Sequence, residues 1–318
     1  MHPDRGRRFP RGMSPPEPPR AAFVVAAYDA ADTLEETVRS ALAQSDPRVE
    51  VVVVDDGSRD ATAEVAARMA AADARVRVVR RANGGPGAAR NSGLALATAP
   101  YVCFLDADDL VPPGKVAAQA AVLDADPALA VVYSGCDAGG TAGEAPRLFP
   151  VETDGDALSR ALLEGADAAF PVHAALARRS AVGAVGAFRE RRPLVEDLDL
   201  WVRLAAAGAR FRHAPDPRVL YRGRAGSRST RAREVLEGLV PVHEWLAAHL
   251  PPDPPERREA VRLRLRWRIL ALAGHAAADG RGARARGLVL RSLRWARRPG
   301  EWAEALRLFA RPPTAPAP

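Results

Sequence analysis

Three carboxylates that directly follow an apolar run are the residues of this chain best suited to chemistry. Residues 101–105 read Tyr-Val-Cys-Phe-Leu, which has the length and composition of a buried strand, and Asp106, Asp108 and Asp109 come next. Acidic side chains this close repel one another unless a cation or a hydrogen-bond network holds them. Their oxygens suit Mg²⁺ or Mn²⁺, which in turn suit diphosphates. The spacing therefore predicts a metal bridge to a nucleoside diphosphate.

This acidic motif has two other interpretations. Acids after a strand also cap the helix that follows, and Asp-x-Asp is also the nucleophile motif of one class of phosphatases. Phosphatases of that class normally place the motif on the first strand of their domain, whereas three strand-like segments precede residue 101 here. The motif alone leaves these alternatives open, so its surroundings have to decide.

Strand-like and helix-like segments alternate around the motif. The pattern predicts strands at 21–27, 49–54, 75–79, 101–105 and 129–133, and helices at 33–43, 60–72, 86–97 and 113–124. A surface loop is expected at 134–155, then a helix at 196–207 and short strands at 210–213 and 218–222. This alternation indicates an α/β fold with a mostly parallel sheet flanked by helices. Ligands of such sheets bind outside the carboxyl ends of the strands, where the acidic motif lies.

Two further motifs end the first two predicted strands. Tyr28 and Asp29 close the first strand, where an aromatic ring can stack on a base, although a half-buried tyrosine at a strand end is the alternative. Residues 55–58 (Asp-Asp-Gly-Ser) close the second strand, where a carboxylate can accept hydrogen bonds from a base or a ribose. The same residues suit helix capping, which is compatible with ligand contact.

A glycine-rich loop precedes the predicted helix that carries Arg90. Residues 83–87 (Asn-Gly-Gly-Pro-Gly) lack the Gly-x-Gly-x-x-Gly spacing and follow the third strand, which argues against dinucleotide binding. Arg90 can instead orient the acidic cluster or bind a phosphate.

In chain order these motifs resemble the nucleotide-binding half of the family-2 glycosyltransferases, which have the GT-A fold. The resemblance covers residues 21–229 and continues in the second half of that range. The matching segments are Ala27-Tyr28-Asp29, Val54-Asp55-Asp56-Gly57-Ser58, Asn83-Gly84-Gly85, Ala89-Arg90-Asn91, Leu105-Asp106-Ala107-Asp108-Asp109, Val185-Gly186-Ala187-Phe188, Glu196-Asp197-Leu198-Asp199-Leu200-Trp201 and Tyr221-Arg222.

The resemblance implies a role for individual residues. Asp197 corresponds to the catalytic base, and Asp108 to the ligand of a divalent cofactor, Mn²⁺ or Mg²⁺. Tyr28 and Asp56 correspond to nucleobase contacts, and Asp106 to a contact with the ribose or the diphosphate. The full set implied to bind the nucleotide sugar is Ala27, Tyr28, Asp29, Asp55, Asp56, Arg90 and Asp106.

Two positions depart from the family pattern. The family usually has Pro-x-Tyr-Asn at the end of the first strand, whereas residues 26–29 are Ala-Ala-Tyr-Asp, which leaves the base contacts less defined. After the Tyr-Arg pair at 221–222 the family often has a His that contacts the metal or the diphosphate. Gly223 and Arg224 stand there instead, and Arg224 is the candidate for the diphosphate contact.

The implied activity is metal-dependent, inverting transfer of a hexose from a nucleoside-diphosphate sugar to an acceptor hydroxyl. A UDP-linked donor is favoured by the resemblance alone, and the implied acceptor is a glycan or a lipid-linked molecule in cell-surface polysaccharide or glycolipid assembly. One alternative is a catalytically inactive GT-A-like scaffold of a glycan-assembly complex, against which Asp106, Asp108 and Asp197 argue. Another is a sugar nucleotidyltransferase, which would need a Gly-rich, Arg-containing loop at residues 27–30.

The six histidines show no metal-ligand spacing. His173 follows Phe170-Pro171 in the acceptor half and is expected to be a structural or a surface residue.

Charge is unevenly distributed along the chain. The net charge is +7, yet residues 21–229 are mildly acidic, while residues 230–318 hold 17 Arg against nine acids. This asymmetry argues against one nucleic-acid-binding surface over the whole protein, and no nucleic-acid partner is expected. Cys103 is expected to be a buried thiol, and residues 1–20 contain no hydrophobic segment. These features favour a cytoplasmic location.

Composition and the family resemblance together divide the chain into four expected segments. Residues 1–20 form a disordered Pro/Arg-rich segment and residues 311–318 a disordered tail. Between them lie a GT-A domain over 21–229 and a helical Arg-rich region over 230–310. The GT-A domain is expected to consist of a nucleotide-sugar-binding half (21–135) and an acceptor half (136–229).

The C-terminal region allows two interpretations. Arginine alternates with apolar residues over 262–268, which fits a strand, but the longer window with Ile269, Leu270 and Leu272 favours a helix. A basic helix with interspersed Trp and Leu can lie on an anionic membrane surface. The alternative, which the pattern favours, is that it packs its apolar side on the catalytic domain and leaves Arg in water. The first interpretation implies peripheral contact with the inner face of the plasma membrane.

Overall fold

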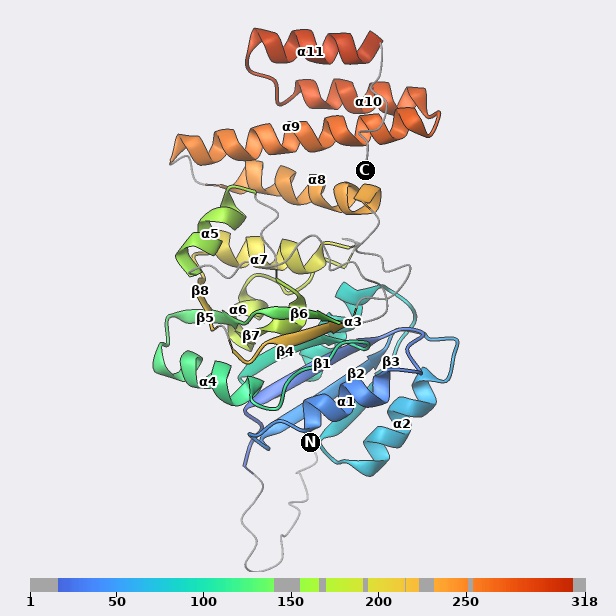
Figure 1. Cartoon of the computed structure of the whole chain (residues 1–318), viewed down its shortest axis with the longest axis vertical. Helices are drawn as coiled ribbons and strands as arrows, with labels where there is room; N and C mark the ends of the chain where they lie inside the picture. Colours follow the sequence, from blue (N-terminus) through green and yellow to red (C-terminus); the bar gives the residue numbers. More distant parts are fainter. Residues whose placement is uncertain are drawn as a thin grey trace, which may run out of the picture.

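The computed structural model describes residues 17–139, 155–165, 170–190, 194–214, 216–222, 232–250 and 254–310. A seven-stranded sheet with the strand order β3-β2-β1-β4-β7-β5-β8 lies at its centre. Helices α8 to α11 lie one after another beyond the α/β part, and α11 is the farthest from the sheet (Figure 1). The predicted fold class, a mostly parallel sheet flanked by helices with an α-helical C-terminal extension, is confirmed.

The first four strands of the chain are parallel to one another, and three of them are buried because their sequences are mostly apolar. The third strand, at the edge of the sheet, is largely exposed. The four strands are β1 (Ala21–Ala27), β2 (Val49–Asp55), β3 (Val76–Arg80) and β4 (Tyr101–Asp106). The helices between them are α1 (Leu34–Leu42), α2 (Thr62–Ala72) and α3 (Pro86–Leu96). The valines of β2 alternate in direction, as a strand requires: Val52 and Val54 share a cluster with Ala89 of α3, whereas Val51 and Val53 join the main core with residues of α1 and α2.

Helix α3 packs unusually close to the sheet. A Cβ on Gly93 would lie 2.3 Å from Val24 Cγ1 of β1, so only glycine fits at this position. This close approach sets the depth of α3 and therefore the position of Arg90, one turn earlier on the same helix.

The rest of the sheet mixes directions. Strand β7 (Ala175–Arg178) lies antiparallel between β4 and β5 (Leu129–Tyr133), and β8 (Arg210–His213) pairs parallel with β5. The other elements are α4 (Lys115–Ala125), α5 (Gly155–Leu163), the 3-10 helix η1 (Val172–Ala174), α6 (Arg179–Ala184) and α7 (Glu196–Ala206).

The prediction of a loop at 134–155 is wrong for residues 136–139, which form a strand. Strand β6 (Cys136–Gly139) pairs in parallel with β9 (Val219–Arg222) to form a second, two-stranded sheet. Its sequence, Cys-Asp-Ala-Gly, has no apolar alternation and therefore did not predict a strand. The strand forms because this segment pairs with β9, which is distant in the sequence. Residues 140–154 of the predicted loop lie outside the described residues.

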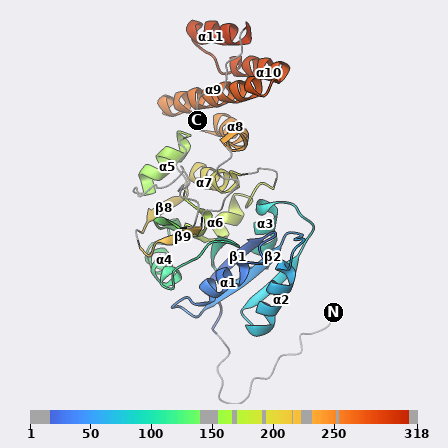
Figure 2. The same cartoon turned by 45° about the vertical axis from the view of Figure 1, so that its right-hand side comes forward.

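Four long helices follow the second sheet. They are α8 (Ala232–His249), α9 (Pro255–Ala278), α10 (Gly282–Leu293) and α11 (Pro299–Ala310). Each packs on the one before it and α8 packs on α7, so the helices form a stack that Figure 2 shows from a second direction. The Arg-apolar alternation at 262–268 belongs to α9, which confirms the helical prediction.

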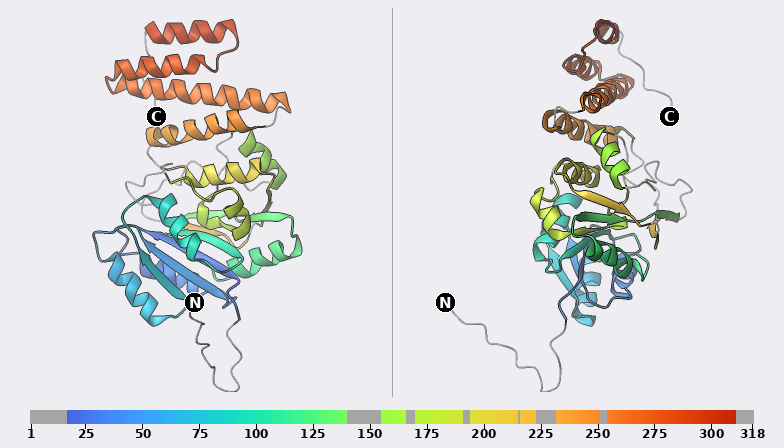
Figure 3. Two further views of the ribbon diagram at one scale, coloured as in Figure 1. Left: turned by 180° about the vertical axis from the view of Figure 1, so that it is seen from behind. Right: turned by 90° about the vertical axis from the view of Figure 1, so that its left-hand side faces the viewer.

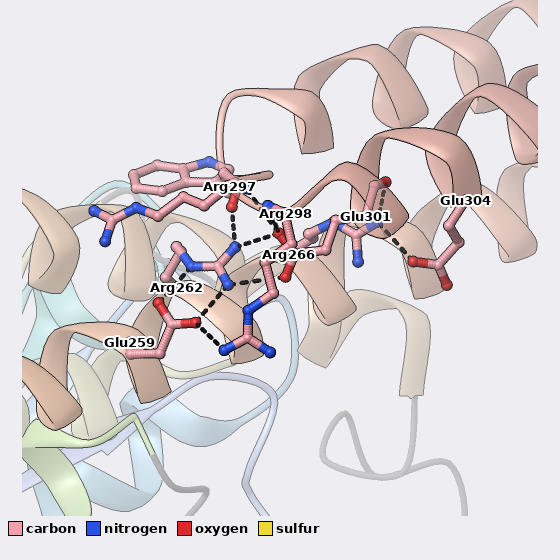
Figure 4. A network of polar contacts seen from close by, with 8 residues as sticks. Glu259, Arg262, Arg266, Arg297, Arg298, Glu301 and Glu304 are labelled. Atoms are coloured by element: carbon pink, nitrogen blue, oxygen red, sulfur yellow. Dashed lines mark hydrogen bonds and ion pairs between the residues drawn. The ribbon is translucent and has the colours of Figure 1, made fainter.

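Ion pairs join α9 to α11 inside this stack. The Arg262 guanidinium lies 2.7 Å from a carboxylate oxygen of Glu259 and 2.9 Å from one of Glu301, and Arg266 lies 2.6 Å from Glu304 (Figure 4). Some arginines of the alternating run are therefore buried and paired rather than left in water. No helix within the described ranges has the length and apolar character needed to cross a bilayer.

Candidate active site

The register of the parallel strands brings the sequence motifs to one edge of the sheet. Ala27 at the end of β1 lies opposite Asp55 of β2, and Ala26 lies opposite Asp106 of β4. The residues after these strands therefore share the carboxyl edge, which Figure 3 shows from behind and from the side. The Tyr28 side chain is 42% exposed at this edge, so its ring is accessible to a base.

The turn after β1 is held by the turn after β2. The Asp29 N–H donates to Ser58 Oγ at 3.1 Å, and Asp29 Oδ1 accepts the Arg59 N–H at 2.8 Å. Asp29 has a φ of 47°, a left-handed conformation that Asp tolerates better than most residues. These bonds fix Tyr28 next to residues 55–58.

Asp55 and Asp56 have protein partners of their own. Asp55 is fully buried, accepts the Ser58 N–H at 2.9 Å and lies 3.1 Å from Arg80 Nε. The carboxylate of Asp56 accepts the N–H groups of Gly84 and Gly85, the latter at 2.7 Å. Both acids thus anchor the turn and the glycine-rich loop, and their predicted contacts with a nucleotide stay predictions.

The three acids after β4 separate into two groups. The Asp106 side chain is 37% exposed and Asp108 is partly exposed, whereas Asp109 is buried. The described part of the chain contains no group of three acidic, His or Cys side chains that could hold a metal. Two carboxylates nevertheless fit Mg²⁺ or Mn²⁺, because such ions are commonly held by one or two protein carboxylates and complete their coordination with phosphate and water. Asp108 remains the proposed ligand.

Arg90 connects the acidic loop of β4 to the start of α7. Its Nη2 donates to Asp106 Oδ1 at 2.6 Å and its Nη1 to Glu196 Oε1 at 2.9 Å, while the guanidinium lies 5.3 Å from the centre of the Phe188 ring. Burial lowers the pKa of Arg90, but Asp106 and Glu196 raise it by more, so the guanidinium is firmly charged. Of the two roles predicted for Arg90, orienting the acidic cluster is the one this geometry supports.

Asp197, the predicted base, is the second residue of α7. Burial raises the pKa of its carboxyl to about 7, and the charge of Glu196 raises it too, while Arg90 and the N–H of Leu198 lower it. A carboxylate with a near-neutral pKa holds a proton more readily than an ordinary aspartate, which suits a general base. The residue as a whole keeps partial solvent exposure although its carboxyl is largely desolvated, so a substrate can still reach it.

A second set of contacts holds the segment next to α7, and the sequence did not reveal it. Buried Arg203 pairs with Asp199 at 2.8 Å and donates to the carbonyls of Val185 and Ala187, both at 2.5 Å. The Asp-Arg spacing of four within a helix was the available signal for this pair. Asn91 of α3 exchanges two hydrogen bonds with the backbone of Phe188, at 2.8 and 2.9 Å.

Arg224 lies outside the described residues, so its predicted diphosphate contact stays a prediction. The strand that precedes it, β9, reaches the acidic loop: the N–H of Arg222 donates to Asp109 Oδ1 at 2.8 Å. The end of β9 thus lies beside the predicted metal-binding residues.

Comparisons with known proteins identify the family of the chain. The model of the family "Glycosyl transferase family 2" matches residues 22–185. The succinoglycan biosynthesis protein ExoU of Rhizobium meliloti is 33% identical over 69% of this chain and 67% of its own length. ExoO of the same organism is 47% identical over 33% of this chain, but the match spans only 30% of ExoO.

Solved structures show the same fold at low sequence identity. S. aureus TarS 1-349 in complex with UDP-GlcNAc superposes with a TM-score of 0.69 and 19% identity, covering 87% of this chain and 82% of TarS 1-349. The mannosyltransferase PcManGT of Pyrobaculum calidifontis, in complex with GDP-Man and Mn²⁺, gives a TM-score of 0.60 and 22% identity over 95% of this chain and 82% of PcManGT. From the family match and the extent of the similarity to ExoU, the chain belongs to glycosyl transferase family 2.

Proposed function

We propose that the protein is a metal-dependent, inverting glycosyltransferase that uses a nucleoside-diphosphate sugar, with UDP as the nucleotide. The observation that carries this proposal is the position of Arg90 between Asp106 and Glu196. The buried guanidinium of Arg90 contacts Asp106, which lies in the loop proposed to bind the cation and the diphosphate. It also contacts Glu196, the neighbour of the candidate base Asp197. The donor and the acceptor hydroxyl would then meet between β4 and α7.

The proposed chemistry needs no covalent intermediate on the enzyme. Asp197 would take the proton from the acceptor hydroxyl as its oxygen attacks the anomeric carbon from the face opposite the leaving group. Asp108, with Asp106 beside it, would hold a divalent cation, which when bound offsets the negative charge on the departing diphosphate. Tyr28 would stack on the base, because it presents an exposed ring at the same edge of the sheet.

The relatives suggest the kind of acceptor. ExoU and ExoO are succinoglycan biosynthesis proteins, so we infer that this protein also acts in polysaccharide assembly, on a glycan or a lipid-linked acceptor. The structural neighbours bind donors with different bases, UDP-GlcNAc and GDP-Man. The choice of UDP therefore rests on the family resemblance.

A thermal-shift screen of nucleotide sugars tests the donor and metal assignments. A ligand that binds only the folded state at 100 times its Kd stabilises a protein by about 2.7 kcal/mol. We expect a UDP-sugar to raise the melting temperature with Mn²⁺ or Mg²⁺, and EDTA or the D108N variant to remove most of this rise. If no nucleotide sugar raises it with either metal, the proposed function is wrong. Mn²⁺-dependent donor hydrolysis would further argue against an inactive scaffold.

We also propose that the C-terminal stack contacts an anionic membrane surface, which would place the protein at the inner face of the plasma membrane. Nine large apolar side chains are exposed in the described part of the chain, and six of them lie on α9 to α11: Leu263, Trp267, Leu290, Trp302, Leu306 and Phe309. Trp302, Leu306 and Phe309 share one face of α11 because they are spaced by four and three residues. Exposed arginines such as Arg294 and Arg297 accompany them, as expected for a lipid-binding surface. The ion pairs of α9 show that the same stack also has an internal packing role.

Flotation with liposomes separates the membrane role from a purely structural one. The protein is expected to float with phosphatidylglycerol liposomes at low salt, and less at high salt, because the attraction is partly electrostatic. The triple variant W302A/L306A/F309A should lose flotation, whereas L96A, which removes an exposed leucine of α3, should keep it. If the full chain does not float at low salt and deleting residues 230–318 only lowers stability, the stack is structural.

A further inference from the structure

The third carboxylate of the acidic loop points into the protein rather than toward the proposed donor site. Asp109 is 1% exposed. Its Oδ1 accepts the N–H of Arg222, and its Oδ2 lies 3.2 Å from Nδ1 of His173 in η1. Burying a carboxylate beside two like charges is costly unless cationic or hydrogen-bond-donor groups face it. The N–H of Arg222 and the ring of His173 are groups that face the Asp109 carboxylate closely.

His173 is as buried as its partner. Its side chain is fully buried, and neither ring nitrogen meets complete hydrogen-bond geometry with a partner among the described residues. A backbone group of Leu220 also lies close to its ring. The ring is nearly parallel to that of Tyr221, with centroids 6.3 Å apart. The imidazole thus sits between the acidic loop and β9.

Strand β9 also contacts the backbone of the acidic loop next to Asp109 and His173. Leu110, just after the loop, exchanges two backbone hydrogen bonds with Leu220, at 3.2 and 3.1 Å. The Nε of Arg222 donates to the carbonyl of Asp108. Three segments far apart in the sequence, the loop at 106–109, η1 and β9, therefore meet at Asp109 and His173.

We propose that Asp109 and His173 are positioning residues that hold the 106–109 loop in the shape in which Asp106 and Asp108 bind a divalent cation together with a nucleoside diphosphate. The inference rests on the proposed function. Asp109 and His173 do not contact the donor. They fix the backbone that carries the two partly exposed carboxylates, Asp106 and Asp108, and they join that backbone to β9.

The test is direct binding of Mn²⁺ in the presence of UDP, measured by the loss of the free-Mn²⁺ signal in electron paramagnetic resonance and by calorimetry. Removing a group that supports metal ligands typically weakens metal binding 10- to 100-fold, so H173L should weaken Mn²⁺ and UDP binding by about that factor. H173N should bind close to wild type, because its amide nitrogen takes the place of Nδ1. H173Q, whose amide reaches the Nε2 position instead, should bind as weakly as H173L.

A second buried histidine supplies the matched control. His243 of α8 is 1% exposed and contacts the carbonyls of Leu239 and Gly165, away from the acidic loop. H243L should lower the melting temperature as H173L does, but leave Mn²⁺ and UDP binding unchanged.

The outcomes separate the two claims. If the wild type binds Mn²⁺ and UDP and all three His173 variants bind equally well, the positioning role is wrong while the proposed function stands. If the wild type binds neither, the proposed function fails and the positioning role fails with it. Should H173L not fold, the comparison of H173N with H173Q still decides, because equal binding by these two polar variants contradicts the role of Nδ1.

Discussion

The D197N variant is expected to lose about 10³-fold in kcat while its affinity for the donor stays close to wild type, because general-base catalysis typically contributes 10²- to 10⁴-fold. An amide cannot take the proton of the acceptor hydroxyl, but it keeps the shape of the side chain and its contact with the N–H of Leu198. Initial-rate kinetics with a saturating donor measure the first effect, and calorimetric titration of the donor measures the second.

The pH dependence of the activity provides a second test of Asp197 as the general base. Its carboxyl has a pKa raised to about 7, and it acts as a base only when ionised. Activity of the wild type should therefore fall as the pH drops through about 7, and be retained above it. Asp156, the exposed second residue of α5, is the matched control, since D156N changes the same kind of helix position away from the site. Near-normal turnover by D197N would contradict the assignment.

Replacing Arg90 with Met should have the largest effect on stability. The change leaves Asp106 and Glu196 without their shared cation, and removing one partner of a buried pair typically costs 3–5 kcal/mol. We expect about 3 kcal/mol, the lower end, because Asp106 is partly solvated. Urea denaturation followed by fluorescence measures the free energy of unfolding.

The more conservative variant R90K tests the bridge itself. Lysine keeps the charge but lacks the fork that reaches two carboxylates at once, so activity should fall even where stability is largely kept. Since Arg90 lowers the pKa of Asp197, the acid limb of the pH profile should move to higher pH in R90M. R39M, which removes an exposed partner of Glu35, should change the free energy of unfolding by no more than about 0.5 kcal/mol. A wild-type unfolding curve for R90M would show that the bridge has no stabilising role.

The sequence predicted the nucleotide-binding half of the sheet well, for a physical reason. Each of β1, β2 and β4 is a mostly apolar run that ends at an acid or a polar turn, so both its type and its end are encoded locally. Parallel pairing of these strands then places their carboxyl ends at the same edge of the sheet, so no long-range contact has to be predicted for this step. The position of Tyr28, Asp55 and Asp106 at that edge therefore followed from three short segments.

Other parts depended on contacts that no local pattern encodes. Arg90 and Glu196 are 106 positions apart, and neither motif indicated which acid the guanidinium would reach. The sequence pattern did not show which of the three acids after β4 would be buried, because the turn that sends Asp109 inward and leaves Asp108 partly exposed depends on contacts with β9 and η1. His173 was expected to be structural or a surface residue; it is fully buried, which excludes the surface.

The small sheet of β6 and β9 has a consequence for the order of folding. Cys136 pairs with Val219, so closing this contact fixes a chain segment of more than 80 residues. The entropy of closing so long a loop is lost before the new contacts compensate, and such pairings form late. Strands β1 to β4 are joined by short helical connections and are expected to assemble first. Because β9 brings Arg222 to Asp109, the acidic loop should reach its final conformation only in the last stage of folding, after the core beneath it is already formed.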